Sequence, residues 1–314
     1  MMVWLLPLTA HAQAGKSVTL EQAVSQAFER HPQLRKIRAR QQLGHAFVEA
    51  AGVYPFNPVL TFDANARIGD QTTFDFQVGL EQELELAGQR GLRVEAATLD
   101  VDAVTLWAER MMLEVAAQVR WAFVDAVAQR ELFTIAQAEL EISKQLLNLA
   151  ERRLVAGAGT QLEIAVAGAE LSKSEEQVNS AAGEYAIARS EVAYAIGLEA
   201  GMLPEPVGGI AKDVPEASMT LAQLMEAATK NRQDLLSLHK TQVAAKKLIE
   251  LARAQAWPNL TLGVFAGQEA GAETLVGGAV SMPLPFFQRN QGGIAVAEAE
   301  LIDAEAETAM KGFV

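Results

Sequence analysis

The most constraining feature of this sequence is a run from Gly91 to about Leu154 that contains no proline and no further glycine. As one α-helix, about 64 residues at 1.5 Å each would measure roughly 95 Å. No compact domain needs a helix of that length, so we expect an extended helical structure. Apolar residues recur in this run at an approximate heptad spacing, with charged residues between them: Leu106, Leu113, Val119, Val124, Leu132, Ala136, Leu140, Leu146 and Leu149.

A second helix follows the long run after a short glycine-rich segment. Residues 156–160 read Ala-Gly-Ala-Gly-Thr and predict a tight turn, and helical sequence then continues from Gln161 to about Ile196. Together these segments predict a long antiparallel helical hairpin over residues 91–197. Prolines and glycines after it mark a linker over residues 198–219.

Before the long run, side-chain polarity alternates with a period of two. Over residues 60–68 and again over residues 74–86, most even positions are apolar and most odd positions are polar. This pattern predicts a β-hairpin over residues 58–86, with a turn at residues 69–72 and with one apolar and one polar face. The period leaves two environments open for the apolar face, namely the core of a soluble protein and lipid.

The same succession of patterns occurs twice, at an offset of about 200 residues. A helical pattern begins after Thr19, which fits an N-cap with Gln22 in a capping box, and it breaks at His31-Pro32. The pattern restarts at Thr220. A period of this length indicates a duplicated half-protein.

The second copy also predicts a β-hairpin, over residues 258–285, with a glycine-rich turn at residues 267–271 and a second strand at residues 275–284. Gln89-Arg90 aligns with Arg289-Asn290, and each pair precedes a helix rich in alanine and glutamate. We therefore predict one complete structural repeat over residues 15–219. A second, incomplete repeat over residues 220–314 holds a helix, the hairpin and the start of a long helix.

Composition and charge exclude several classes of function. The formal net charge of −13 argues against a nucleic-acid partner. The chain has no cysteine, so we expect no disulfide, no thiolate chemistry and no lipid anchor on an N-terminal cysteine. The four histidines are scattered without ligand spacing, and serine and aspartate residues form no nucleophile–base pattern. We expect no metal site, no cofactor and no enzymatic activity.

Residues 1–14 read as the remnant of a signal peptide, because an apolar stretch runs into Ala-His-Ala-Gln-Ala, which offers small-x-small cleavage sites. No later segment reaches the roughly 18 uninterrupted apolar residues of a membrane-spanning helix. If the chain crosses a membrane, we expect its strands to do so.

Two segments resemble a known family. Residues 153–163, Arg-Leu-Val-Ala-Gly-Ala-Gly-Thr-Gln-Leu-Glu, resemble the periplasmic tip of TolC-type outer-membrane efflux proteins, where a helical hairpin turns at a glycine. Residues 282–292, Met-Pro-Leu-Pro-Phe-Phe-Gln-Arg-Asn-Gln-Gly, are similar to the strand-to-helix junction of the heavy-metal branch, the cobalt–zinc–cadmium type. With the repeat, the resemblance covers nearly the whole chain after the signal segment.

The resemblance implies a mainly α fold with long antiparallel helical hairpins and two β-hairpins per chain. Each subunit of a homotrimer would give four strands to a shared twelve-stranded barrel in the lipid of the outer membrane and its helices to a periplasmic tunnel. The tip would dock on a periplasmic adaptor, which links the duct to a proton-driven inner-membrane pump. Family members usually continue through a second helical hairpin, so we expect this chain to be C-terminally truncated.

The function that the resemblance implies is a passive conduit for export, here of divalent heavy-metal cations such as cobalt, zinc, cadmium or copper. Two alternatives stay open. One is a duct of the same family for drugs or other organic solutes, and the other is a periplasmic helical-hairpin adaptor or structural protein.

Two sets of candidate site residues follow. On the polar strand face, carboxylates repeated in three subunits would form lumen-facing rings that favour cations, whereas the plainer alternative is a solvated strand end: Asp75, Glu81, Glu83 and Glu85. At the tip, an adaptor-docking surface is predicted, whereas the plainer alternative is a simple helix–helix turn: Arg153, Leu154, Gly157, Thr160 and Leu162.

Overall fold

The computed structural model describes residues 17–68, 72–199, 201–209, 220–269 and 273–312. The predicted signal segment, most of the turn at residues 69–72 and part of the predicted linker lie outside the described residues. No helix of the described ranges has a stretch long and apolar enough to cross a membrane.

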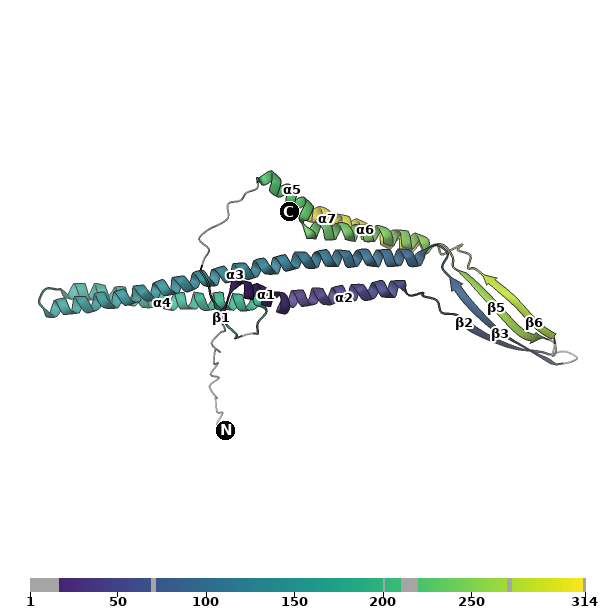
Figure 1. The fold of residues 1–314 in the computed structure, drawn as a ribbon, viewed down its shortest axis with the longest axis horizontal. Helices are drawn as coiled ribbons and strands as arrows, with labels where there is room; N and C mark the ends of the chain where they lie inside the picture. Colours follow the sequence, from purple (N-terminus) through teal and green to yellow (C-terminus); the bar gives the residue numbers. More distant parts are fainter. Residues whose placement is uncertain (1–16, 69–71, 200, 210–219, 270–272, 313–314) are drawn as a thin grey trace, which may run out of the picture. The chain divides into compact units, whose positions relative to one another are not determined.

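The chain is mainly helical, and one order of elements occurs twice (Figure 1). Two helices, an antiparallel strand pair and a further helix make up each copy. In the first copy these are α1 (Leu20–Arg30), α2 (Pro32–Gly52), β2 (Val59–Arg67), β3 (Thr73–Leu84) and α3 (Gln89–Val155). In the second they are α5 (Leu221–Asn231), α6 (Gln233–Ala254), β5 (Leu260–Glu269), β6 (Glu273–Ser281) and α7 (Gln291–Gly312). Between the copies lie α4 (Gln161–Ile196) and β4 (Glu205–Pro206), and β1 (Ser17–Val18) precedes α1.

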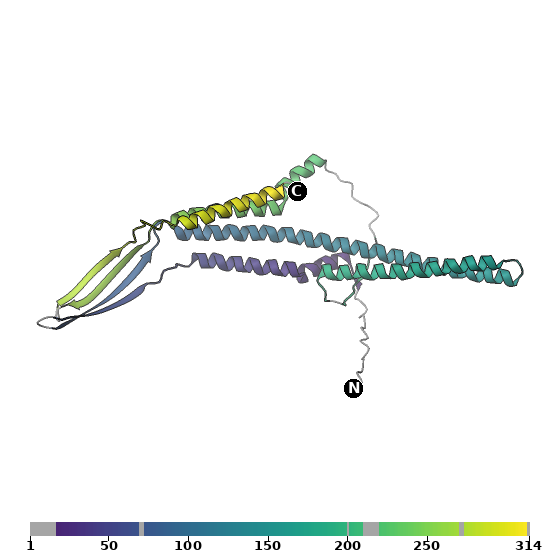
Figure 2. The same ribbon diagram turned by 180° about the vertical axis from the view of Figure 1, so that it is seen from behind.

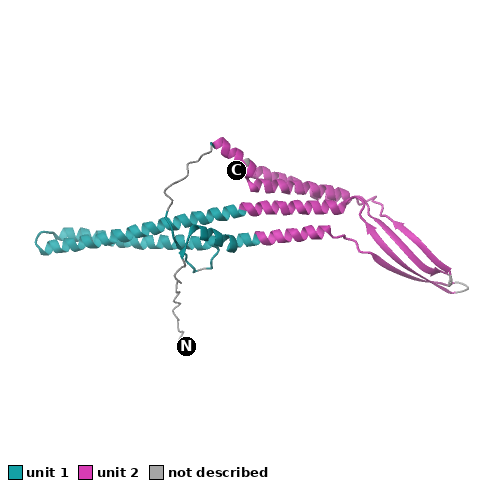
Figure 3. Cartoon of the chain, in the orientation of Figure 1, with its two compact units in different colours: residues 1–36, 111–220 teal, residues 37–110, 221–314 magenta. Residues whose placement is uncertain are grey.

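The chain divides into two compact units, which do not coincide with the two sequence repeats (Figure 3). Unit 1 holds residues 1–36 and 111–220, and unit 2 holds residues 37–110 and 221–314. The reason is strand pairing. The β-hairpins of both copies join in one sheet, and this brings the first hairpin and the start of α3 into the same unit as the second copy.

The four strands of unit 2 form one antiparallel sheet in the order β2-β3-β5-β6. The central pair, β3 and β5, connects the hairpins of the two copies, and both views of the chain show the four strands side by side (Figures 1 and 2). The prediction of a turn at residues 267–271 is wrong at its start, because β5 continues to Glu269. A Cβ atom on Gly267 would lie 3.0 Å from the Cα of Gln77, so this glycine meets a close approach of neighbouring backbone within the sheet.

The helices of unit 2 lie beside one another through small side chains and a few polar contacts. Ile249 and Ala252 of α6 pack against Ala297 of α7. The Ser237 hydroxyl donates to the main-chain oxygen of Ala103, at 2.8 Å. Small residues at these positions allow the helix backbones to approach closely.

Unit 1 is held by a core among α1, the second part of α3, and α4. The predicted capping box at the start of α1 is confirmed: the Thr19 side chain accepts from the Gln22 amide, and the Gln22 side chain accepts from the Thr19 amide. At the end of α4, Gly197 adopts φ +78°, which satisfies the last carbonyls in a left-handed cap. The core side chains are apolar and mostly small: Val18, Ala23, Ala27, Leu34, Val115, Val119, Phe123, Ala126, Val127, Ala188, Val192, Ala195 and Ile196.

Part of the predicted linker is fixed to unit 1. Residues 203–208, which we term the strap, include β4, and β4 pairs in parallel with β1. Arg130 donates to the carbonyl oxygens of residues 206 and 208, at 2.6 and 2.7 Å. Arg189 donates to those of residues 203 and 204, at 2.7 and 2.9 Å. The strap is therefore an ordered element, a feature that its prolines and glycines did not predict.

Candidate functional site

The sheet of unit 2 has a continuous apolar face that the described part of the chain leaves exposed. The register places Phe62 opposite Val78, and Leu80 opposite Val264, so the even positions of neighbouring strands share this face. Phe62 is 68% exposed, and the highest exposure among these side chains is 74%, at Val276. An exposed apolar face of this extent is typical of a surface that contacts lipid or another protein. Its large side chains are Leu60, Phe62, Phe74, Phe76, Val78, Leu80, Leu262, Val264, Val276 and Val280.

The opposite face of the sheet is acidic. Every charged residue of β2, β3, β5 and β6 is at an odd position, and Arg67 is the single cation among them. The charged residues are Asp63, Arg67, Asp75, Glu81, Glu83, Glu269 and Glu273. One face thus suits an apolar environment, and the other suits water and cations.

The structure puts the four predicted acidic residues in different surroundings. Asp75 forms an ion pair with Arg67, at 2.7 Å. Glu81, in β3, lies between Val59 and Gly263. Glu83 accepts a hydrogen bond from the Asn259 side chain (2.7 Å), whereas Glu85 follows the last residue of β3 and makes a bidentate ion pair with Arg93 (2.5 and 3.1 Å).

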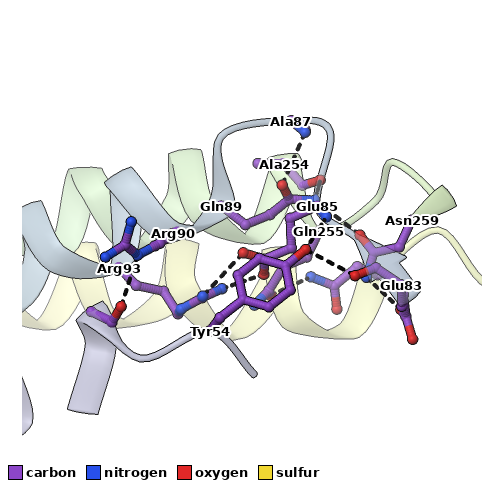
Figure 4. Close-up of polar contacts among 12 residues, drawn as sticks. Tyr54, Glu83, Glu85, Ala87, Gln89, Arg90, Arg93, Ala254, Gln255 and Asn259 are labelled. Atoms are coloured by element: carbon purple, nitrogen blue, oxygen red, sulfur yellow. Dashed lines mark hydrogen bonds and ion pairs between the residues drawn. The ribbon is translucent and has the colours of Figure 1, made fainter. Parts of the chain in front are cut away.

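Glu83 and Glu85 belong to a polar network where the sheet meets the helices (Figure 4). The Tyr54 hydroxyl donates to the main-chain oxygen of Glu83 (2.9 Å) and accepts from the amide of Glu85 (3.0 Å). The Glu85 side chain is only 8% exposed, and its ion pair with Arg93 compensates the cost of burying its charge. The network fixes the end of β3 against α2 and α3.

Helices α3 and α7 begin with the same device. The Gln89 side-chain oxygen accepts from the amide of Ala87 (2.9 Å), and that of Gln291 accepts from the amide of Arg289 (2.8 Å). The residue before each glutamine is left-handed, with φ +73° at Gly88 and φ +54° at Asn290. Gln89 therefore matches Gln291, which corrects the alignment of Gln89-Arg90 with Arg289-Asn290. The pair of a glycine or asparagine followed by glutamine is the sequence signal that would have predicted this match between the two helix starts.

A cavity of about 620 Å³ opens beside this network. Its polar lining includes Glu83, Glu85 and Arg93, and its apolar lining includes Trp257 and Phe287. Phe287 is 93% exposed. Within the described residues, no group of histidine, aspartate and glutamate side chains is arranged to hold a metal ion.

The predicted docking residues lie at the turn between α3 and α4, and most of them build that turn. Gly157 has φ +71°, the Arg153 guanidinium donates to the main-chain oxygen of Ala158 (3.1 Å), and the Thr160 hydroxyl caps α4 by accepting from the Glu163 amide (3.2 Å). Leu154 is half-buried.

Leu162 is different, because its side chain is 72% exposed and serves no described contact within the turn. Val155, which the sequence analysis did not single out, is 91% exposed. These two large apolar side chains of the tip are therefore exposed and can contact another protein.

Comparison with known proteins bears on the fold and the family. The sequence profile of the outer membrane efflux protein family matches residues 23–198. This chain belongs to that family. Family membership places the protein in the outer membrane.

Individual relatives are distant. The chain is 25% identical to the cobalt-zinc-cadmium resistance protein CzcC of Cupriavidus metallidurans over 308 residues, which cover 96% of this chain and 71% of CzcC. It is also 25% identical to the pyoverdine export outer membrane protein OpmQ of Pseudomonas putida over 260 residues, 80% of this chain and 54% of OpmQ. The chain spans about half the length of OpmQ (54%) and 39% of the fusaric acid resistance protein FusA of Burkholderia cepacia.

The fold is shared with solved channels. The crystal structure of CusC superposes with a TM-score of 0.72 at 17% sequence identity, covering 99% of this chain and 79% of CusC. The predicted fold class, long helical hairpins with antiparallel strands of the TolC type, is therefore confirmed.

Proposed function

We propose that this chain is a subunit of an outer-membrane efflux channel that conducts divalent heavy-metal cations passively out of the cell. The observation that carries the proposal is the two-sided sheet: an exposed apolar face suited to lipid, and an opposite face whose charges are almost all carboxylates. Such a sheet fits a wall between membrane and water-filled lumen.

Association with further copies follows from the sheet edges. β2 and β6 are the edge strands, and their unpaired backbone groups require partners in lipid. We propose a homotrimer in which these edges pair between subunits and close a barrel. The helical part then extends into the periplasm.

The acidic face supports a cationic substrate, because rings of carboxylates lower the energy of cations in a lumen. In this proposal Asp75, Glu81 and Glu83 face the lumen, with Glu85 held by Arg93 at the rim. The alternative is an organic solute. It is supported by the aromatic residues of the 620 Å³ cavity and by the name of the pyoverdine exporter among the relatives.

The tip supports a docking role. Because Arg153, Gly157 and Thr160 shape the turn, we propose that they present exposed Val155 and Leu162 to the helices of a periplasmic adaptor. The adaptor would connect the duct to an inner-membrane pump driven by protons. This chain would bind the pump only indirectly.

Deletion of the gene in its native host tests the proposal. We expect lower tolerance of zinc, cobalt, cadmium or copper, restored by the wild-type gene and not by Leu162→Asp, which removes the apolar contact at the tip. Glu163→Gln, a neighbouring change outside the proposed contact, is the matched control and should restore tolerance. Unchanged metal tolerance together with lost tolerance of organic compounds would replace the metal proposal by the organic one.

A further inference from the structure

Three carboxylates lie in one row across the acidic face of the sheet. The register of β3 and β5 ends with the pair of Phe76 and Gln268, and Asp75 and Glu269 are the next residues along these two strands. Glu269 in turn pairs with Glu273 of β6. Like charges at directly opposed positions of an antiparallel sheet repel and destabilise the pairing.

Arg67 is the counter-ion of this row. From the end of β2 it forms ion pairs with Asp75, at 2.7 Å, and with Glu269. Its ion pairs thus connect three strands, since the planar guanidinium, with five donors, can bind two carboxylates at once. The Asp75 side chain is 17% exposed, whereas those of Arg67 and Glu269 are 55% and 41% exposed, so the row faces water.

We propose that Arg67 sets the cation selectivity of the duct by neutralising part of this carboxylate row. The inference rests on the proposed function, in which the acidic face lines the lumen. With Arg67 in place, the row carries three carboxylates and one guanidinium. Without it, each subunit presents one more unit of negative charge to passing ions.

Reversal potentials test the inference. The purified full chain is inserted into planar phosphatidylcholine bilayers under a KCl gradient at low ionic strength, where the Debye length is about 30 Å. Arg67→Gln should raise the cation-to-anion permeability ratio at least about twofold, the factor that one elementary charge exerts on a monovalent ion about 10 Å away in water. Arg67→Lys keeps the charge and should stay near the wild-type ratio.

Two further variants test the same role of Arg67 if Arg67→Gln alone does not fold. Glu269→Gln alone should lower the ratio, and Arg67→Gln combined with Glu269→Gln should restore it, because the second pair of changes conserves net charge and relieves the opposed carboxylates. Arg253→Gln removes an exposed ion pair with Glu298 on the helices and should change nothing.

The outcomes separate the two proposals. Equal permeability ratios for Glu269→Gln and the double variant, or for wild type and Arg67→Gln, would overturn the role of Arg67 and leave the conduit intact. A wild-type chain that inserts but never conducts would instead count against the conduit itself, and the inference would fall with it.

Discussion

Single side chains hold the sheet of unit 2 to its helices. Glu85 is only 8% exposed and accepts two hydrogen bonds from Arg93. Glu85→Gln should lower the free energy of unfolding of unit 2 by about 1.5–3 kcal/mol, because it leaves the partly buried Arg93 without its counter-ion. Thermal unfolding followed by circular dichroism measures the loss. Glu298→Gln, which removes an exposed ion pair, is the control and should cost at most about 1 kcal/mol.

Tyr185 predicts a stability change at alkaline pH. Burial, and a hydrogen bond from its hydroxyl to Glu205 of the strap (2.5 Å), raise the pKa of Tyr185 from 10.0 to about 12. Because the folded state favours the protonated phenol, this contribution to stability is complete below pH 10.0 and is lost as the pH rises towards 12. Tyr185 should therefore give a step near pH 12 in the titration of tyrosinate absorbance. In Tyr185→Phe that step should vanish, and an unchanged titration curve would contradict the assignment.

Among single residues, the sequence predicted a role correctly where a residue type at a given spacing has one common structural role. Thr19 followed by Gln22 is a capping box by spacing alone, and the structure contains it. Gln89 and Gln291 escaped notice because a glutamine side chain has many uses, and because their left-handed neighbours, Gly88 and Asn290, differ in type. The partners of Glu83 and Glu85 depend on contacts made across the fold, which no local pattern encodes.

Glycine-to-alanine substitutions in the helical hairpin of α3 and α4 should change its stability in opposite directions at two positions. Gly157 adopts φ +71°, so Gly157→Ala should destabilise the helical hairpin by about 1–2 kcal/mol. Gly168 lies inside α4, and an added Cβ would meet no atom within 4 Å. Gly168→Ala should therefore stabilise the hairpin by up to about 1 kcal/mol. Chemical denaturation of the two variants beside wild type checks both signs, and equal shifts would refute the explanation.

Elements were predictable where periodicity is long or regular. The run without proline or glycine became α3, and the alternation of residues 60–86 became β2 and β3 with the expected faces. Gly267 was wrongly predicted to lie in a turn, because a glycine required in a strand for a close backbone approach cannot be distinguished in sequence from a turn glycine. The sequence did not predict an ordered strap, because the strap is held by Arg130 and Arg189, which are distant from it in sequence.

The whole protein should depend on the apolar face of its sheet for residence in the outer membrane. Phe62→Arg puts a charge on that face, at a cost of about 2–4 kcal/mol if the position lies in the middle of the bilayer. We expect less protein in the outer-membrane fraction and more degradation. Asp63→Arg places the same side chain on the opposite face and should leave membrane recovery unchanged. Equal recovery of both variants would argue against lipid contact at the apolar face.

Across both units, many contacts between distant segments run from a long polar side chain to a main-chain carbonyl oxygen. Arg90 binds the carbonyl of residue 52, Gln89 that of residue 254 and Asn290 that of residue 252, while Arg130 and Arg189 bind the strap. Every amino acid carries that carbonyl. The residue that supplies the main-chain oxygen can therefore be substituted without loss of the hydrogen bond, whereas the residue whose side chain donates cannot. Contacts of this kind are one way in which a fold can persist at 17% sequence identity, as between this chain and CusC.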